Sequence, residues 1–298
     1  MRRADGQTGR RAVRCAALLG VSLLIQAPQL PAQADDLLRA DRAAAKRSEE
    51  CGFACGLGSA LSEDAFYLHH GMPIIHGAQA ARSFLQVQDT LLSHRVQWEP
   101  LEGRVSADGS FGVTWGVTAV GLRGGPVRMG RYITAWRREG TGWRVAAHVQ
   151  TRLNEASELT RPAGWTAPPL PDLSSRATLA PFLAADRSFA GQAAREGAAD
   201  AFAAWAAPDA VLFGLTELIR GPDAIRQAFA GPPSQWQWEP VGAGGADDGS
   251  LGFTVGEATI LRTLPSGAEV TTRSKYLTIW ARMADGEIRF VVDGGNGR

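Results

Sequence analysis

Three polar residues in the C-terminal part of the chain, Glu257, Tyr276 and Asp293, could together carry out acid–base chemistry. A carboxylate between apolar side chains has a raised pKa and can exchange a proton near neutral pH. A tyrosine hydroxyl can donate a hydrogen bond to an oxygen that becomes negatively charged during a reaction. The same residues are also compatible with a purely structural role in a half-buried sheet, where Glu257 accepts a hydrogen bond from Tyr276.

Alternation of apolar and small or polar residues predicts strands around these three residues, with Ser266-Gly267 and Asp285-Gly286 as hairpin turns. Cross-strand partners share one face of a sheet, so this register gathers the polar residues among apolar ones. Such an apolar hollow with a few polar groups is typical of a small-molecule site. The predicted partners are Glu257 with Tyr276, Val255 with Thr278, Phe253 with Trp280, Asp293 with Thr278, and Val291 with Trp280.

The N-terminal half gives a comparable face when Gly124-Gly125 is taken as its hairpin turn, but with histidine in place of the carboxylates. His148 stands where the other half has Asp293, and Val117 stands where it has Glu257, so the two halves cannot share one carboxylate mechanism. A neutral imidazole at His69 or His148 could accept a proton near pH 7. The alternative is a surface histidine pair and a structural histidine at a strand end. The predicted face consists of Val113, Trp115, Val117, Tyr132, Thr134, Trp136 and His148.

The aromatic and aliphatic members of the two faces are the candidate ligand contacts. A metal site built from His69, His70, His76 and His148 is disfavoured, because adjacent histidines on a strand point to opposite faces. We expect neither a metal nor a cofactor. The candidate contacts are Trp115, Tyr132, Trp136, Phe253, Val255 and Trp280.

An internal repeat positions these residues. Trp98-Glu99-Pro100 recurs as Trp238-Glu239-Pro240, and Asp108-Gly109-Ser110 recurs as Asp248-Gly249-Ser250. Many further matches follow in the same order, which predicts one structural unit present twice. In each copy, helical spacing comes first and strand alternation second, so each copy is predicted to be an α+β layer structure. The second copy contains the clearest helix, residues 179–196, which Gly197 is placed to end.

The N-terminus predicts export. Residues 1–34 combine several arginines, an apolar stretch over 16–25 and an Ala32-Gln33-Ala34 cleavage motif, which is the pattern of a signal peptide. The apolar stretch is about half as long as a bilayer span, so no permanent membrane helix is expected. We therefore expect a periplasmic or secreted protein.

Composition indicates which partners are disfavoured, where the domains divide and which states the cysteines can take. A net charge of +1, from 31 basic and 30 acidic residues, disfavours binding to nucleic acid. Prolines concentrate in residues 153–178, which predicts a linker between domains at 35–152 and 179–298. After export the chain keeps Cys51 and Cys55, for which a local structural disulfide and two free buried thiols are equally open, and catalytic thiol chemistry is a lesser third option.

The motifs that carry a family resemblance are clearest in the second copy. They are Asp209-Ala210-Val211-Leu212-Phe213, Gly221-Pro222-Asp223-Ala224-Ile225, residues 249–256, Tyr276-Leu277-Thr278-Ile279-Trp280 and Asp293-Gly294-Gly295-Asn296. With this order of helices and strands the chain resembles the nuclear transport factor 2-like superfamily, in particular its SnoaL-like branch and the domain-of-unknown-function 4440 family. The first copy matches these motifs more loosely.

The resemblance implies two cones, each with N-terminal helices packed on a curved antiparallel sheet. It also implies that His69, counted from Asp64-Ala65, is similar in position to the catalytic base of ketosteroid isomerase-like members. Because a fold does not decide function, three functions stay open. The first is an exported module that binds a small, mainly apolar molecule. The second is an isomerase or lyase that uses acid–base residues in one cone. The third, less favoured, is a structural or partner-binding domain whose cones are filled by side chains.

The second face of each predicted sheet is also apolar, with Leu277, Ile279, Phe290 and Val292 in the second copy. A sheet that is apolar on both sides must be covered on both. We therefore expect the two copies to pack sheet against sheet, so that one chain imitates a homodimer.

Overall fold

The computed structural model describes residues 30–92, 95–121, 125–152, 179–214, 217–232 and 234–298. The predicted signal peptide, apart from residues 30–34, and the predicted linker 153–178 lie outside the described residues. The first helix begins at Leu30, so cleavage after Ala34 would remove its first turn. Among the described residues no helix combines the length and apolar character needed to cross a bilayer.

The first half contains three helices and six strands, with the helices preceding the long strands. Its elements are α1 (Leu30–Cys51), α2 (Phe53–Ala60), β1 (Leu61–Leu68), β2 (Ile75–His76), α3 (Ala78–Leu92), β3 (Arg95–Val105), β4 (Phe111–Gly121), β5 (Arg128–Glu139) and β6 (Gly142–Arg152).

The second half repeats the same order of elements. Gly197, at a φ of 91°, separates its first two helices, and Pro222 opens the third, where a missing N–H costs nothing. Its elements are α4 (Ala180–Glu196), α5 (Ala198–Trp205), β7 (Ala206–Phe213), β8 (Leu218–Arg220), α6 (Pro222–Ala228), β9 (Ser234–Gly245), β10 (Leu251–Thr263), β11 (Glu269–Arg282) and β12 (Ile288–Gly297).

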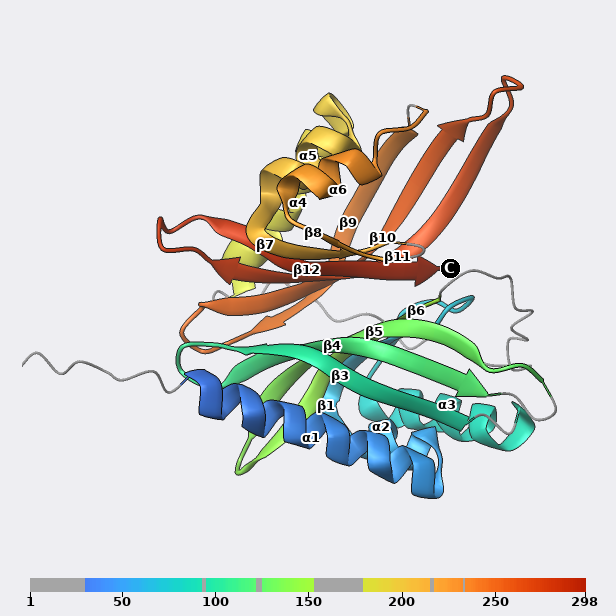
Figure 1. Ribbon diagram of the computed structural model, residues 1–298, viewed down its shortest axis with the longest axis vertical. Helices are drawn as coiled ribbons and strands as arrows, with labels where there is room; N and C mark the ends of the chain where they lie inside the picture. Colours follow the sequence, from blue (N-terminus) through green and yellow to red (C-terminus); the bar gives the residue numbers. More distant parts are fainter. Residues whose placement is uncertain (1–29, 93–94, 122–124, 153–178, 215–216, 233) are drawn as a thin grey trace, which may run out of the picture.

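Each half forms one six-stranded sheet, with strand orders β2-β1-β6-β5-β4-β3 and β8-β7-β12-β11-β10-β9. Neighbouring strands are antiparallel except β1 with β6 and β7 with β12, which are parallel. The sheets lie face to face in the middle of the molecule, and the helices of each half cover the outer face of its own sheet (Figure 1). Each sheet therefore has an outer face toward its helices, here called the cone face, and an inner face toward the other half.

The two inner faces share one hydrophobic core. Phe111 of β4 and Phe253 of β10 stack with ring centroids 6.0 Å apart, and the ring of Phe66 lies 6.2 Å from that of Phe253. One apolar cluster contains Val113, Trp115, Ile133 and Val149 together with Val255, Leu277, Ile279 and Val292. The predicted packing of sheet against sheet is therefore present in the fold.

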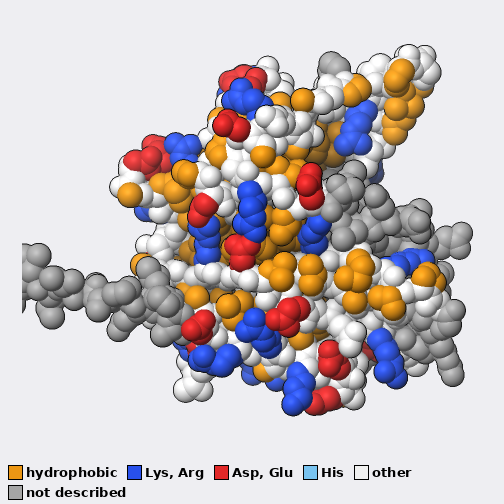
Figure 2. All heavy atoms as spheres, viewed as in Figure 1, with side chains coloured by type: hydrophobic (Ala, Val, Ile, Leu, Met, Phe, Trp, Pro, Cys, Tyr) orange, Lys and Arg blue, Asp and Glu red, His pale blue; other side chains and the backbone are white. Residues whose placement is uncertain are grey.

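Polar contacts between the halves are partly reciprocal, as between the subunits of a two-fold dimer. The backbone N–H of Asp108 donates to the carboxylate of Asp248 at 3.0 Å, and the N–H of Asp248 donates to that of Asp108 at 3.1 Å. Arg104 pairs with Asp209 and Arg220 with Glu102 across the halves. Figure 2 shows acidic and basic side chains next to each other where the two halves meet.

Candidate functional site

The register of the β10–β11 hairpin differs by one residue from the predicted register. Gly256, and not Glu257, pairs with Tyr276, and Glu257 pairs with Lys275. The loop is the reason: Leu264 pairs with Ala268 around three residues, with Gly267 at a φ of 83°, in place of the predicted two-residue turn. Because side chains alternate, a shift of one residue moves every β10 side chain to the other face.

The prediction of one shared face was therefore wrong for the β10 residues. Tyr276, Thr278, Trp280 and Asp293 lie on the cone face, whereas Phe253, Val255 and Glu257 lie on the inner face. A bulge after Ile279 also pairs Trp280 with Phe290 in place of the predicted Val291.

The first half shows the same one-residue difference. Thr134 pairs with Thr114, and Trp115 pairs with Ile133. Tyr132, Thr134, Trp136 and His148 therefore lie on the cone face, and the predicted members Val113, Trp115 and Val117 lie on the inner face.

A buried carboxylate organises the first cone. Asp41 of α1 is 1% exposed and accepts hydrogen bonds from Trp98 Nε1 at 2.6 Å and from the Tyr132 hydroxyl at 2.7 Å. Burial raises the pKa of Asp41, against the opposing effect of hydrogen bonds that include those from Tyr132 and Trp98. Beside this group Trp136 Nε1 donates to Thr114 Oγ1 at 2.8 Å.

The second cone repeats the arrangement. Asp186 of α4 accepts hydrogen bonds from Trp238 Nε1 at 2.7 Å and from the Tyr276 hydroxyl at 3.0 Å. Trp280 Nε1 donates to Thr254 Oγ1 at 2.8 Å. Burial raises the pKa of Asp186 to about 6. Tyr276 is therefore the partner of a helix carboxylate, and not of Glu257 as predicted.

His148 in the first cone has a ring nitrogen without a partner. Its Nδ1 lies 2.8 Å from Thr134 Oγ1, while its Nε2 is buried with no hydrogen-bond partner. Burial lowers the pKa of His148 to about 3, so the imidazole is neutral at physiological pH. Its ring stacks on Tyr67 with centroids 5.8 Å apart.

Two further buried atoms, Gln88 Oε1 and Asp89 Oδ1 of α3, lack partners. Phe53 contacts His148, with ring centroids 6.1 Å apart. The residue after Phe53 donates its backbone N–H to Asp89 Oδ2 at 2.8 Å. Buried polar atoms almost always have a partner. Among the described residues Trp115 Nε1, Thr151 Oγ1 and Asn296 Oδ1 also lack one.

His69 directly follows β1 and lies near Tyr67. Its ring centroid is 6.2 Å from that of Tyr67 and 4.9 Å from that of Phe84, and its Nδ1 lies 2.8 Å from the carbonyl oxygen of His70. His69 and His148 thus both contact Tyr67, and the structure brings these two candidates into one region.

Asp293 occupies the place of His148 in the second cone and is 8% exposed. Thr278 Oγ1 donates a hydrogen bond to its carboxylate. Burial raises the pKa of Asp293 to about 7, and the negative charge of Asp186 contributes to the increase. The second cone therefore contains two carboxyl groups that can hold a proton near neutral pH.

Glu257 lies outside both cones. It forms an ion pair with Arg298 and faces Lys275, whose side chain is fully buried and donates to the carbonyl oxygen of Gly297 at 2.7 Å. Burial lowers the pKa of Lys275 to about 7, although Glu257 acts in the opposite direction.

Replacement of this buried lysine is expected to stabilise the protein. Between pH 7 and 10.5 the unfolded chain holds a proton on Lys275 that the folded chain lacks, so stability rises with pH in this window. Lys275→Met should raise the free energy of unfolding at pH 7 by about 2 kcal/mol and reduce this slope. Urea denaturation at pH 7 and pH 10 tests this, and a destabilised variant would contradict it.

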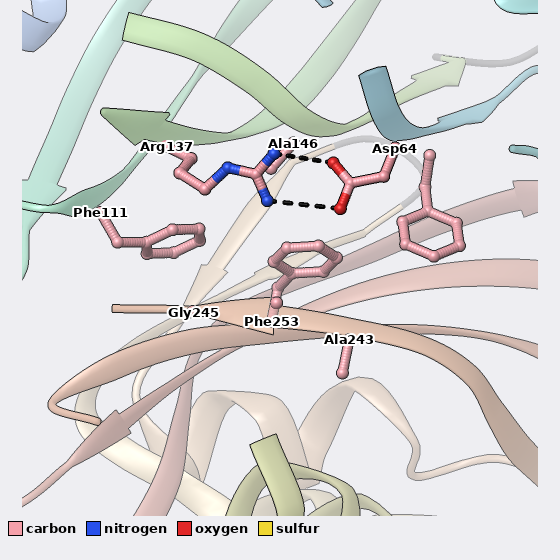
Figure 3. A pocket seen from close by; sticks show the side chains of 9 residues that line it. Asp64, Phe111, Arg137, Ala146, Ala243, Gly245 and Phe253 are labelled. Atoms are coloured by element: carbon pink, nitrogen blue, oxygen red, sulfur yellow. Dashed lines mark hydrogen bonds and ion pairs between the residues drawn. The ribbon is translucent and has the colours of Figure 1, made fainter. Parts of the chain in front are cut away.

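The candidate ligand contacts divide between the two faces. Tyr132, Trp136 and Trp280 are buried in the cones, whereas Trp115, Phe253 and Val255 belong to the contact between the halves. Phe253 also lines a small cavity there, where Arg137 and Asp64 form an ion pair at 2.7 Å (Figure 3). With about 10 Å³ of free volume, this cavity has room for about one water molecule.

Two residues that organise the cones, Asp41 and Asp186, were not predicted as site residues. The sequence does contain a signal: both occupy the same position of the repeat, on otherwise apolar helix faces. A charged residue at a buried helix position points to a polar partner inside the fold. Within the described residues no three His, Cys, Asp or Glu side chains gather into a group that could hold a metal ion.

Comparison with solved structures finds proteins that resemble single halves of this chain. A ketosteroid isomerase-like protein from Erwinia carotovora atroseptica is 17% identical with a TM-score of 0.36, covering 41% of this chain and 97% of its own. An NTF2-like protein with a cystatin-like fold from Novosphingobium aromaticivorans is 15% identical with a TM-score of 0.33, covering 40% and 80%. No family model and no curated protein matches the chain.

The fold predicted from the resemblance is confirmed. Both halves have the nuclear transport factor 2-like α+β fold, with N-terminal helices packed on a six-stranded sheet. Membership of the domain-of-unknown-function 4440 family stays a prediction.

Proposed function

We propose that this chain is an exported protein whose first cone binds a small, uncharged molecule with an apolar ring and at least one hydroxyl or similar group. One observation carries the proposal: His148 Nε2 is buried without a partner. The aromatic rings of Phe53, Tyr67 and Tyr132 around His148 favour a ring-shaped ligand.

The ligand's polar group follows from the chemistry of these atoms. His148 Nε2 is a donor or an acceptor according to the tautomer that Thr134 selects. A hydroxyl group can satisfy either tautomer because it both donates and accepts. Asp89 Oδ1, beside the elbow that carries Phe53, is an acceptor, which also favours a ligand that carries a donor. A charged ligand is disfavoured because burial in this cone penalises charge, as the low pKa of His148 indicates.

Phenol is a suitable probe, with fluorobenzene as the matched ligand that lacks the hydroxyl group. We expect isothermal titration calorimetry to detect phenol binding and much weaker fluorobenzene binding. His148→Phe keeps a ring of similar size and removes Nε2, so phenol affinity should fall about tenfold or more. Equal affinity of the variant and the parent would contradict the proposal. Loss of binding in Asp293→Asn alone would place the site in the second cone.

A second candidate function is favoured by the second cone, where the pKa values of Asp186 and Asp293 are raised to about 6 and 7. Groups that titrate near the working pH are efficient general acids and bases. Asp293 would accept a proton from a carbon next to a carbonyl group, as in an isomerase or lyase. Deuterium incorporation into cyclohexanone in D₂O, followed by NMR, tests this. Equal rates with the parent chain and Asp293→Asn would rule out this role.

The contact between the sheets favours a structural role for the duplication, in which the two halves pair with each other. In this proposal the two domains, 35–152 and 179–298 with the linker between them, form an intrachain pseudo-dimer. It is supported by the reciprocal contacts of Asp108 and Asp248. Each half then covers the apolar inner face of the other.

A further inference from the structure

An exposed disulfide closes the elbow between α1 and α2 in the first half. α1 ends at Cys51, Gly52 adopts a φ of 97°, and α2 begins at Phe53. Cys51 and Cys55 are bonded to each other, and both residues are exposed. Because both sulfurs belong to exposed residues, an external thiolate can approach this disulfide.

The middle one of the three residues between the two cysteines, Phe53, lies next to the proposed ligand site. Phe53 is 4% exposed, and its ring centroid lies 6.1 Å from that of His148, 6.4 Å from that of Tyr67 and 5.6 Å from that of Trp98. The disulfide therefore joins the residues on either side of Phe53, and the Phe53 ring lies next to that of His148.

The elbow is also tied to α3 through Asp89, which accepts the N–H of Ala54 at 2.8 Å. A Cβ atom at Gly52 would lie 2.7 Å from the carboxylate of Asp89, so the elbow and this carboxylate are tightly fitted. Movement of the elbow would consequently change the surroundings of both Phe53 and Asp89, two of the groups around the site.

The second half provides an internal comparison. Its elbow at Gly197 has φ and ψ of 91° and 160°, against 97° and 165° at Gly52. Both glycines donate their N–H to the carbonyl oxygen four residues earlier, at 2.9 Å for Gly52 and 3.0 Å for Gly197. The second elbow contains no cysteine, and Ala198 stands in the place of Phe53. The elbow conformation therefore forms without a cross-link, so the disulfide is not needed to set it.

From these observations we infer that the Cys51–Cys55 disulfide is a redox gate that keeps Phe53 closed over the ligand site of the first cone. This inference rests on the proposed function for its ligand. A dithiol reduces the disulfide: the S–S bond breaks, two electrons and two protons pass to the two cysteine sulfurs, and the dithiol becomes a disulfide. The reduced elbow keeps its shape on average, opens more often and admits the ligand.

Hydrogen–deuterium exchange of the full chain tests the gate directly, with and without dithiothreitol. Cross-linking a short loop restricts its open states, so reduction should speed exchange in residues 53–60 by about tenfold. Residues 198–205 of the second half are the matched internal control and should not change. Cys51→Ser with Cys55→Ser should reproduce the reduced behaviour without a reductant.

Phenol binding, measured by stopped-flow fluorescence in both redox states, tests whether opening of the elbow admits the ligand. We expect association to be about tenfold faster with the reduced chain. Phe53→Ala, which keeps the disulfide, should bind phenol equally fast in both states. Identical exchange in the oxidised and reduced chains would overturn the gate, and so would global unfolding on reduction.

The two proposals can fail separately. Faster exchange in residues 53–60 without phenol binding in either state would support opening of the elbow and contradict the proposed ligand. Equal phenol association in both states, with exchange unchanged, would support the ligand and overturn the gate.

Discussion

Asp293→Asn should raise the free energy of unfolding at pH 7.5 by about 2–4 kcal/mol. The folded chain holds a proton on Asp293 up to a pKa of about 7, whereas a free aspartate carboxyl group has a pKa of 3.8. Between these two pH values the folded state binds more protons than the unfolded state, so stability falls as pH rises. An uncharged amide of the same shape removes this loss and can still accept the hydrogen bond from Thr278.

Urea denaturation between pH 4 and 8 measures the effect. The parent chain should lose stability across this window, and the variant should lose less. Glu269→Gln, at an exposed position of the same sheet, is the control and should leave the pH dependence unchanged. An unchanged pH dependence in Asp293→Asn would mean that this carboxyl group is solvated in the folded protein. A carboxylate retained at a cost in stability is what an acid–base site requires.

Asp41→Ala should have the opposite effect to Asp293→Asn and lower the free energy of unfolding by about 3–5 kcal/mol. The variant leaves the buried Trp98 Nε1–H and the Tyr132 hydroxyl without their shared acceptor. Unpaired buried donors lose their hydrogen bonds to water without replacement. Asp41→Asn keeps one acceptor oxygen and should lose less.

Asp35→Ala, at an exposed position of the same helix, is the matched control and should change stability little. Thermal unfolding followed by circular dichroism and urea titration both report the difference. A loss below about 1 kcal/mol for Asp41→Ala would mean that water replaces the carboxylate between Trp98 and Tyr132. The same comparison at Asp186 tests whether the second network contributes equally.

The two cones differ at one position of an otherwise repeated network. His148 is a neutral imidazole with an unpartnered nitrogen, and Asp293 is a carboxyl group with a pKa of about 7. The first is suited to recognise an uncharged polar group, and the second to exchange a proton. Duplication of the fold thus leaves room for two different activities in one chain.

The sequence by itself determined the architecture. The repeated motifs, Gly197 after the helix and Pro222 at the start of another predicted two copies of a helix-then-sheet unit, because these signals are local and occur twice. The pairing of Thr278 with Asp293 was also correct, since the Asp285-Gly286 turn lies only a few residues away. The apolar second face predicted the packing between the sheets.

Only the tertiary structure decided which side chains face the cones. A three-residue loop in place of a two-residue turn moved Glu257, Val255 and Phe253 to the inner face, and local composition does not distinguish the two loops. The partnership of Asp41 with Tyr132 joins residues 91 positions apart. Such pairs depend on how a helix packs on its sheet, which no short stretch of sequence encodes.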